Sequence, residues 1–255
     1  MASRHNSGDR NFVPGTAPVS NRSLRIMNAE REAIFDKVKT TLPHGKDERE
    51  AAIATKFQDI DEMIAEISAR ENMSPETILH FAHNQSGYTM MHVAAEYGRD
   101  EMVDYLFRPQ MYSDRPAMRT AILMARNTTL DRPIHIAARN DSVEFIRALV
   151  VKGININSIG AFGFTCLHQA VRLRYQQLVA DLVDMGANLD IQSMSGQTAL
   201  HIAVQNNDIG MTRFLLDKGA DAAIRNAGGL TPDEVAQRLK DKSVHLLFIA
   251  RRLLH

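Results

Sequence analysis

The sequence repeats around one stretch, Gly196-Gln197-Thr198-Ala199-Leu200-His201-Ile202-Ala203-Val204. Thirty-three residues earlier stands Gly163-Phe164-Thr165-Cys166-Leu167-His168-Gln169-Ala170-Val171, and thirty-three residues later stands Gly229-Leu230-Thr231-Pro232. Glycine and threonine recur in phase in all three stretches, and histidine recurs in the first two. A fixed period of this length predicts a fold of stacked repeats.

Two further histidines extend the pattern towards the N-terminus. His92 and His135 precede His168 and His201, and the four lie at intervals of 43, 33 and 33 residues. A second apolar stripe follows each histidine, and three units continue into a turn that contains glycine: Lys152-Gly153-Ile154-Asn155, Met185-Gly186-Ala187-Asn188 and Lys218-Gly219-Ala220-Asp221. Together these segments resemble the ankyrin-repeat family, whose Thr-Pro-Leu-His-x-Ala pattern recurs with a period of about 33 residues.

The resemblance covers residues 84 to about 245. It implies an all-α solenoid in which each unit has a finger-like hairpin and two antiparallel helices, stacked into a curve with a concave binding surface. The units are 84–116, 127–159, 160–192, 193–225 and a divergent cap at 226–245, with an insertion at 117–126 and a C-terminal helix end at 246–255. The insertion either contacts a partner or accommodates packing between the first two units.

A helical block is expected before the repeats. Residues 1–23 are polar and aperiodic, which indicates a disordered arm. Within 24–83, a first helix should end before Pro43 and a third should start at Ser74-Pro75. The second has one apolar face, made of Ile53, Phe57, Ile60, Ile64 and Ile67. We expect this N-terminal block to cap the stack, because terminal repeats need a polar outer face. The alternative is a separate functional module.

Several positions depart from the family pattern. Leu130 and Arg132 stand where the family prefers glycine and threonine, so we expect a distorted finger there. Arg174 stands where a left-handed residue is expected, and arginine is less suited to that geometry than glycine. The last unit has Asp233-Glu234 in place of its histidine region and should act as a C-terminal cap, followed by a helix through Leu246 to Leu254.

The sequence offers no sign of catalysis. It contains no dinucleotide fingerprint, phosphate loop, nucleophile elbow or zinc-protease motif, so we expect neither an enzyme nor a bound cofactor. His92, His135, His168 and His201 lie one per unit on helices about 8–10 Å apart, and cannot share a metal whose ligands lie within about 2.3 Å. The family resemblance implies a structural role instead, in which each histidine ties its own finger to the neighbouring one.

The overall composition points to a protein partner. Thirty basic and thirty acidic residues cancel, which argues against nucleic acid as a ligand. The single cysteine, Cys166, permits no internal disulfide and lacks a placed base that would make it a nucleophile. No apolar run approaches the roughly 18 residues of a membrane span. We expect an intracellular and cytoplasmic protein; nuclear location, release into a host cell by a non-classical route, and the oligomeric state are left open.

The family's binding positions lie on the finger tips and on the exposed side of the inner helices. Transferred to this chain, they give Tyr88, Glu96, Tyr97, Asp131, Arg139, Asn140, Phe162, Phe164, Arg172, Leu173, Met194, Gln197, Gln205 and Asn206. The aromatic pair Phe162 and Phe164 is unusual for a finger, and aromatic residues often dominate binding energy. Because the charges among these positions are mixed, we expect apolar anchors rather than charge to hold the partner.

Two functions fit these features. The first is a non-catalytic adaptor that binds a partner protein through the concave face and fingers. The second is a targeting subunit or a host-directed effector, in which residues 24–83 carry or recruit a separate activity.

Overall fold

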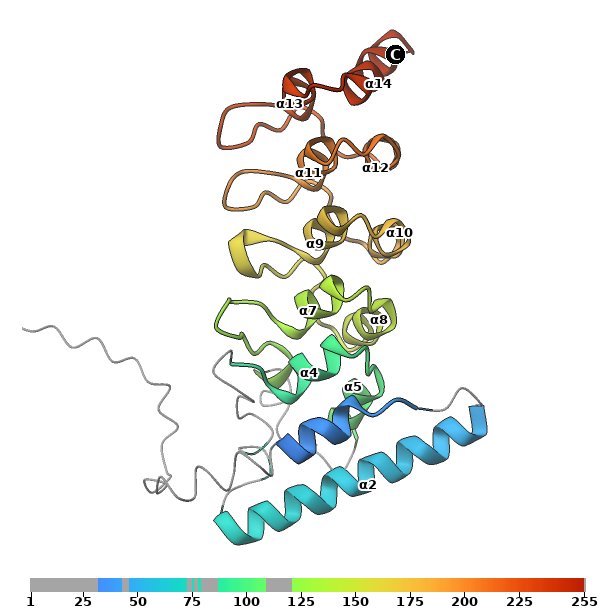
Figure 1. The fold of residues 1–255 in the computed structure, drawn as a ribbon, viewed down its shortest axis with the longest axis vertical. Coiled ribbons are helices and arrows are strands. Elements are labelled where there is room, and N and C mark those ends of the chain that lie inside the picture. The colour runs from blue at the N-terminus through green and yellow to red at the C-terminus, as the bar shows by residue number, and fades with distance from the viewer. Residues whose placement is uncertain are drawn as a thin grey trace, which may run out of the picture.

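Pairs of short helices stacked one above another make up most of the structure, a computed structural model that describes residues 32–42, 46–72, 75, 78, 87–108 and 121–254. The first helix of each pair lies in an inner column and the second in an outer column (Figure 1). The inner helices are α4 (Met90–Glu96), α7 (Pro133–Arg139), α9 (Cys166–Leu173), α11 (Ala199–Gln205) and α13 (Pro232–Arg238). The outer helices are α5 (Glu101–Leu106), α8 (Val143–Val151), α10 (Gln176–Asp184), α12 (Ile209–Asp217) and α14 (Ser243–Leu254). This arrangement confirms the predicted repeat solenoid.

Small side chains let the inner helices approach one another. Each inner helix contacts the next along the stack, from α4 to α13. One alanine of the repeated motif is fully buried in each of the first four units: Ala94, Ala137, Ala170 and Ala203. Because these side chains end at Cβ, close helix packing leaves no void between the units. The buried apolar side chains of all the units join into one continuous core.

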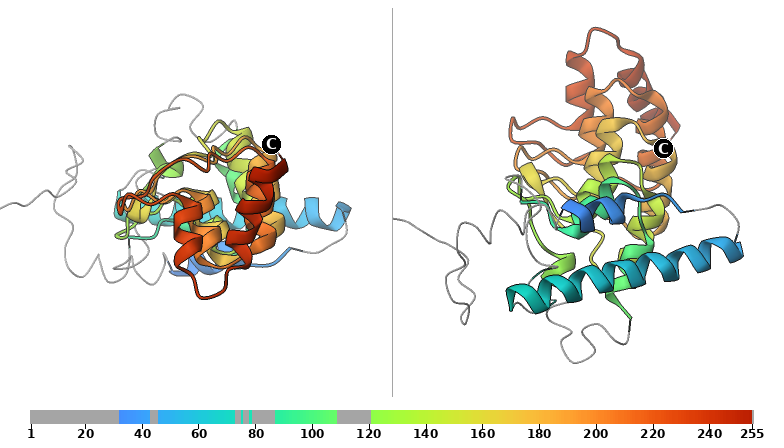
Figure 2. Two further views of the ribbon diagram at one scale, coloured as in Figure 1. Left: turned by 90° about the horizontal axis from the view of Figure 1, so that it is seen from above. Right: turned by 60° about the horizontal axis from the view of Figure 1, so that its bottom comes forward.

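A finger projects from the same side of the stack before α7, α9, α11 and α13 (Figures 1 and 2). In four fingers a backbone N–H closes a five-residue loop by donating to a carbonyl four residues later, at 2.8–2.9 Å. We call these loops the finger loops; they span 127–131, 160–164, 193–197 and 226–230. Loop 127–131 has the same closure as the others, so the distortion expected there is absent. Leu130 instead adopts the left-handed geometry, with φ 68°, that glycine has in the other three loops.

The ends of the inner helices follow the predicted chemistry. The hydroxyls of Thr165, Thr198 and Thr231 each accept a hydrogen bond from the backbone N–H three residues later, which caps the helix. Arg174 ends α9 with φ 63°, in the left-handed position expected from the repeat. Its Nη2 donates to the carbonyl of Asn206 in the next unit, and this contact holds the strained residue in place.

Two N-terminal helices lie across the end of the stack beside α5 (Figure 1). The first covers 32–39 and ends before Pro43, as predicted. The second, α2 (Lys46–Glu71), buries the apolar face predicted for it: Phe57, Ile60, Ile64 and Ile67 are buried and Ile53 is partly buried. Pro75 and Ile78 are helical, but the rest of the predicted third helix and the arm at 1–23 lie outside the described residues.

A buried ion pair joins these helices to the first repeat. The ammonium of Lys56 in α2 donates to Glu101 Oε1 of α5 at 2.7 Å, and both side chains are only 4 % exposed. The same ammonium donates to the carbonyls of Val38 at 2.9 Å and Thr40 at 3.2 Å. Burial lowers the pKa of Lys56, and Glu101 opposes that shift. All three of its donors have partners, as a buried charge requires.

A second polar contact lies on the same interface. Asp61 of α2 accepts hydrogen bonds from Tyr105 Oη at 2.8 Å and from Arg108 Nη2 at 2.9 Å. The guanidinium of Arg108 lies 4.2 Å from the ring centroid of Tyr105 and 4.9 Å from that of Phe57. The N-terminal block therefore packs on α5 through charges, hydrogen bonds and aromatic contacts together.

The predicted boundary between the divergent cap at 226–245 and the C-terminal helix end at 246–255 does not coincide with a helix end in the structure. Helix α14 begins at Ser243, so the boundary falls inside it, and α14 packs on α12 and α13 as the outer helix of the fifth pair. Val244 and Phe248 are buried on one of its faces, whereas Leu246, Ile249 and Leu253 are exposed on the opposite face. The C-terminal helix therefore completes the last unit, but its outer face is not polar.

The insertion at 117–126 contributes to packing. Residues 121–123 are helical, and Ile122 and Leu123 are fully buried in the core. The segment 109–120 lies outside the described residues. The described half of the insertion therefore accommodates packing, and a partner contact by the remainder stays a prediction.

We predict that Lys56→Met lowers the free energy of unfolding by about 3–5 kcal/mol, because it leaves Glu101 buried without its partner. Urea denaturation of the full chain measures this loss. The matched control is Lys37→Met, since Lys37 pairs with Asp59 near the surface and should cost no more than about 1 kcal/mol. Equal effects of the two substitutions would contradict a special role for the buried pair.

Candidate protein-interaction surface

Each of the four repeated histidines is held by backbone groups through both ring nitrogens, and three of them join neighbouring units. In each, Nδ1 accepts a hydrogen bond from the backbone N–H of the residue three positions earlier, at 3.1–3.2 Å. In three of them Nε2 lies 3.0–3.1 Å from a backbone carbonyl of the next unit: Asp131 for His92, Gln197 for His168 and Leu230 for His201. In His135, Nε2 lies 2.9 Å from the carbonyl of Ser158, at the end of its own unit. These contacts match the structural role that the family resemblance implied.

The partners of the rings decide their protonation. An amide N–H can only donate and a carbonyl can only accept, so Nδ1 must be unprotonated and Nε2 must carry the hydrogen. Burial lowers the pKa of all four, to about 4 for His92. The rings are therefore neutral near pH 7, and both nitrogens of each ring are occupied by the scaffold.

The joint between the second and third units uses a carboxylate in addition. Asp131 is fully buried, and its Oδ1 accepts a hydrogen bond from the backbone N–H of Ala161 at 3.0 Å. At the next two joints the matching N–H, of Met194 and Ala227, donates to a backbone carbonyl of the preceding finger. Glycine is required at 160, because a Cβ there would lie 2.7 Å from Asp131 Oδ1. Asp131 thus replaces a main-chain acceptor.

This role removes Asp131 from the surface expected to contact a partner. Its Oδ2 accepts a hydrogen bond from Arg139 Nη1 at 2.7 Å, so the charge of Arg139 is neutralised within the second unit. The sequence placed both residues on the binding face because they occupy exposed positions in the family pattern. Burial of Asp131 excludes it, and Arg139 keeps only a partly exposed, paired guanidinium.

The other predicted binding residues of the first two units do not form one cluster in the sequence of elements, because they lie before α4 and at the ends of α4 and α7. Glu96, Tyr97 and Asn140 are exposed at the C-terminal ends of α4 and α7. Tyr88 is half-buried and stacks on His92, with ring centroids 5.4 Å apart. Its ring therefore supports the histidine and offers a partner only part of its surface.

In the third unit the two aromatic candidates, Phe162 and Phe164, have different environments. Phe162 is 74 % exposed and projects from loop 160–164 with φ 56°. Phe164 is half-buried and stacks on His168, with an interplanar angle of 8° and centroids 5.4 Å apart. Phe162 is available to a partner, whereas Phe164 belongs mainly to the scaffold.

Exposed apolar side chains line the adjacent fingers. Met194 in loop 193–197 is 74 % exposed, and its N–H donates to the carbonyl of Phe162 at 3.0 Å. Leu130 in loop 127–131 and Ile159, which precedes loop 160–164, are each 47 % exposed. We call Leu130, Ile159, Phe162 and Met194 the finger ridge. Leu130 and Ile159 were missed in the sequence, although the departure of Leu130 from glycine was a usable signal.

The remaining candidates are Gln197, in loop 193–197, and four residues at the C-terminal ends of α9 and α11. Arg172, Leu173 and Gln205 are exposed, and Gln197 and Asn206 are half-buried. Arg172 donates to Gln169 Oε1 at 2.7 Å, and Asn206 Nδ2 donates to the carbonyl of Val171 at 3.2 Å. Their polar groups are therefore partly engaged within the stack.

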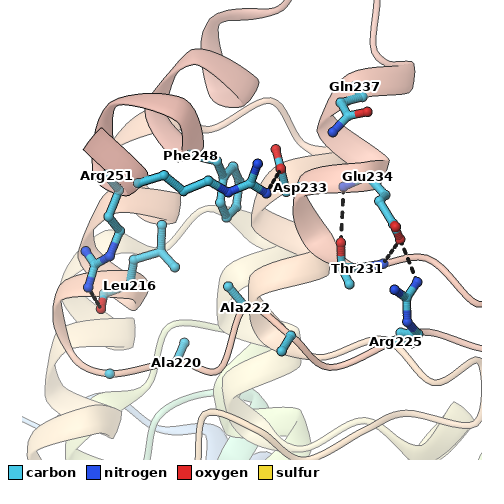
Figure 3. A pocket seen from close by; sticks show the side chains of 13 residues that line it. Leu216, Ala220, Ala222, Arg225, Thr231, Asp233, Glu234, Gln237, Phe248 and Arg251 are labelled. Atoms are coloured by element: carbon cyan, nitrogen blue, oxygen red, sulfur yellow. Dashed lines mark hydrogen bonds and ion pairs between the residues drawn. The ribbon is translucent and has the colours of Figure 1, made fainter. Parts of the chain in front are cut away.

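A pocket of about 830 Å³ at the C-terminal end is a weaker candidate (Figure 3). Three arginines line it, and each already has a partner: Arg225 pairs with Glu234, Arg251 with Asp217, and Arg252 with Asp233. The opposite wall consists of small residues from the turn at 219–223. Because its charges are paired internally, the pocket presents little to recognise a ligand.

The chemistry of the cysteine is also settled by its surroundings. Cys166 is fully buried, and burial raises the pKa of its thiol to about 12. The thiolate is the reactive form, so Cys166 is inert near neutral pH. Within the described part of the chain, no cluster of three His, Cys, Asp or Glu side chains could hold a metal ion. None of the described helices is long and apolar enough to cross a membrane.

Comparison with family models gives matches over most of the stack. Models described as ankyrin repeats in three copies, ankyrin repeats in many copies, and a single ankyrin repeat match residues 121–193, 182–236 and 86–114. The matched segments contain the four finger loops and the inner helices, except for the last two residues of α13. A comparison with curated proteins found no matching relative.

We predict that the protein loses stability as pH falls below about 6.5, the ordinary histidine pKa. The unfolded chain then binds more protons than the folded chain, whose histidine pKa values are lowered. Each histidine contributes up to about 1.4 kcal/mol per pH unit, and for His92 the loss continues to about pH 4. Urea denaturation at several pH values measures the slope.

The control is His92→Gln, which should lower stability at neutral pH and make the decline with pH shallower, because one titrating ring is gone. Stability that stays constant or rises between about pH 7 and pH 5 would contradict the neutral-ring account.

Proposed function

Because the chain belongs to the ankyrin-repeat family, we propose that it is a non-catalytic adaptor that binds a partner protein through its fingers and concave face. Ankyrin repeats generally act as protein-interaction modules. The finger ridge is the part of this chain that best suits that use, since it gathers exposed apolar side chains from three neighbouring fingers. Aromatic, methionine and aliphatic anchors of this kind supply most of the energy in protein interfaces.

The observation that supports a binding role most strongly is the strained backbone at two residues of the finger ridge. Leu130 and Phe162 are bulky residues in the left-handed region, with φ 68° and 56°. This geometry costs about 1–2 kcal/mol for a residue with a side chain. Glycine would avoid the cost, and the exposed parts of both side chains add little to the core. Strain without a folding benefit is a feature of functional positions. Partner binding accounts for it.

The N-terminal helices are proposed to serve as the cap of the stack. The buried Lys56–Glu101 pair and the Asp61–Tyr105 contact bind α2 closely to the first repeat. These observations favour the adaptor over a targeting subunit or effector with a separate N-terminal function.

We predict that Phe162→Gly weakens partner binding by about 2 kcal/mol, on the scale of an interface hot spot. The free energy of unfolding should change by less than about 1 kcal/mol, because relief of strain offsets the lost contact with Phe164. The partner is identified by affinity capture on the wild-type chain with mass spectrometry. Calorimetric titration of that partner and urea denaturation then measure the two effects.

Val151→Gly is the matched control, since Val151 is 76 % exposed but lies on the outer helix α8. It should leave binding unchanged. If Phe162→Gly binds the captured partner with wild-type affinity, the finger ridge is not the interaction surface.

A further inference from the structure

Two arginines flank the first finger loop of the ridge. Arg126 precedes loop 127–131 and is exposed, and Arg132 follows it and is half-buried. Arg132 adjoins the ridge, because its Nη1 donates to the carbonyl of Ile159 at 3.3 Å and Leu130 lies two residues away. Arg126 is close enough for its charge to act on Arg132. A basic pair therefore stands directly beside the apolar anchors.

The guanidinium of Arg132 is incompletely satisfied. Its Nε is buried and has no hydrogen-bond acceptor among the described residues. No carboxylate in the described part of the chain pairs with Arg132 or Arg126. Burial lowers the pKa of Arg132, and the neighbouring charge of Arg126 adds to that shift. Because Nε is buried, the donors that a bound acceptor can reach are those of the partly exposed Nη groups.

The rest of the finger edge supplies no negative charge. The finger loops with one residue on each side span 126–132, 159–165, 192–198 and 225–231, and their sequences contain a single acidic residue, Asp131. That residue is buried and committed to Ala161 and Arg139. The third arginine of these segments, Arg225, already pairs with Glu234. Arg126 and Arg132 are therefore the arginines of these segments that have no carboxylate partner among the described residues.

We propose that the finger ridge binds an acidic peptide segment of the partner, with a carboxylate on Arg132 and Arg126 and apolar side chains on Ile159, Phe162 and Met194. This inference rests on the proposed function and specifies the chemistry of the partner. Arginine suits the role because its planar fork binds a carboxylate through two hydrogen bonds. The charge of the arginines adds specificity, because apolar contacts alone discriminate poorly between peptides and do not fix the register in which a peptide binds.

The test uses a random dodecapeptide library displayed on phage and selected against the full chain. Enriched peptides should combine Asp or Glu with large apolar residues. The strongest, made synthetically, should bind Arg132→Gln about tenfold more weakly than wild type. The same loss should follow when its acidic residues are replaced by amides, and binding should weaken at high salt. Urea midpoints of the variants verify that the fold is intact.

Arg213→Gln is the matched control, because Arg213 is an exposed arginine on the outer helix α12. It should bind the peptide like wild type. Enrichment of basic or uncharged peptides, or equal affinity of wild type and Arg132→Gln, would overturn the acidic segment while leaving the adaptor function standing. If no peptide is enriched and no partner is captured, both the acidic segment and the adaptor function are contradicted.

Discussion

The stack depends on neutral imidazoles, three of which join their own unit to the next. In His168, Nδ1 accepts from the start of its own helix and Nε2 donates to the following finger, so one side chain fixes both the helix end and the position of its neighbour. A protonated ring could not accept at Nδ1, and burial keeps the ring neutral. The residues that build the fold are consequently fully occupied. The proposed recognition of a partner therefore rests on positions that differ between units.

Those positions lie on the fingers, and buried polar contacts hold the finger backbone in place. Asp131 ties the second finger to the third and neutralises Arg139, while Arg132 above it has no carboxylate among the described residues. Leu130 and Phe162 take left-handed geometry and expose their side chains. At the other end of the stack, Lys56 and Glu101 hold the N-terminal helices in place. The buried charges of Lys56, Glu101 and Asp131 are paired, whereas Arg132 has no carboxylate partner in the described part of the chain and lies beside exposed apolar side chains.

Much of the fold could be predicted because the repeat period and the threonine–histidine pair each have a local physical cause. The site was less predictable. Asp131 was assigned to the surface because the sequence does not show that Gly160 leaves room for its carboxylate. Leu130 suggested a distorted finger, but Asn127 holds the loop by accepting from the N–H groups of Thr129 and Asp131. Such contacts depend on the path of a neighbouring backbone, which no periodic pattern specifies.

Amide hydrogen exchange of the full chain, with and without its captured partner, would locate the interaction surface. Binding at the finger ridge predicts slower exchange in 126–132, 159–165 and 192–198, with little change in the outer helices α8, α10 and α12. Protection confined to those outer helices, with unchanged fingers, would contradict a surface built on the positions that differ between repeats.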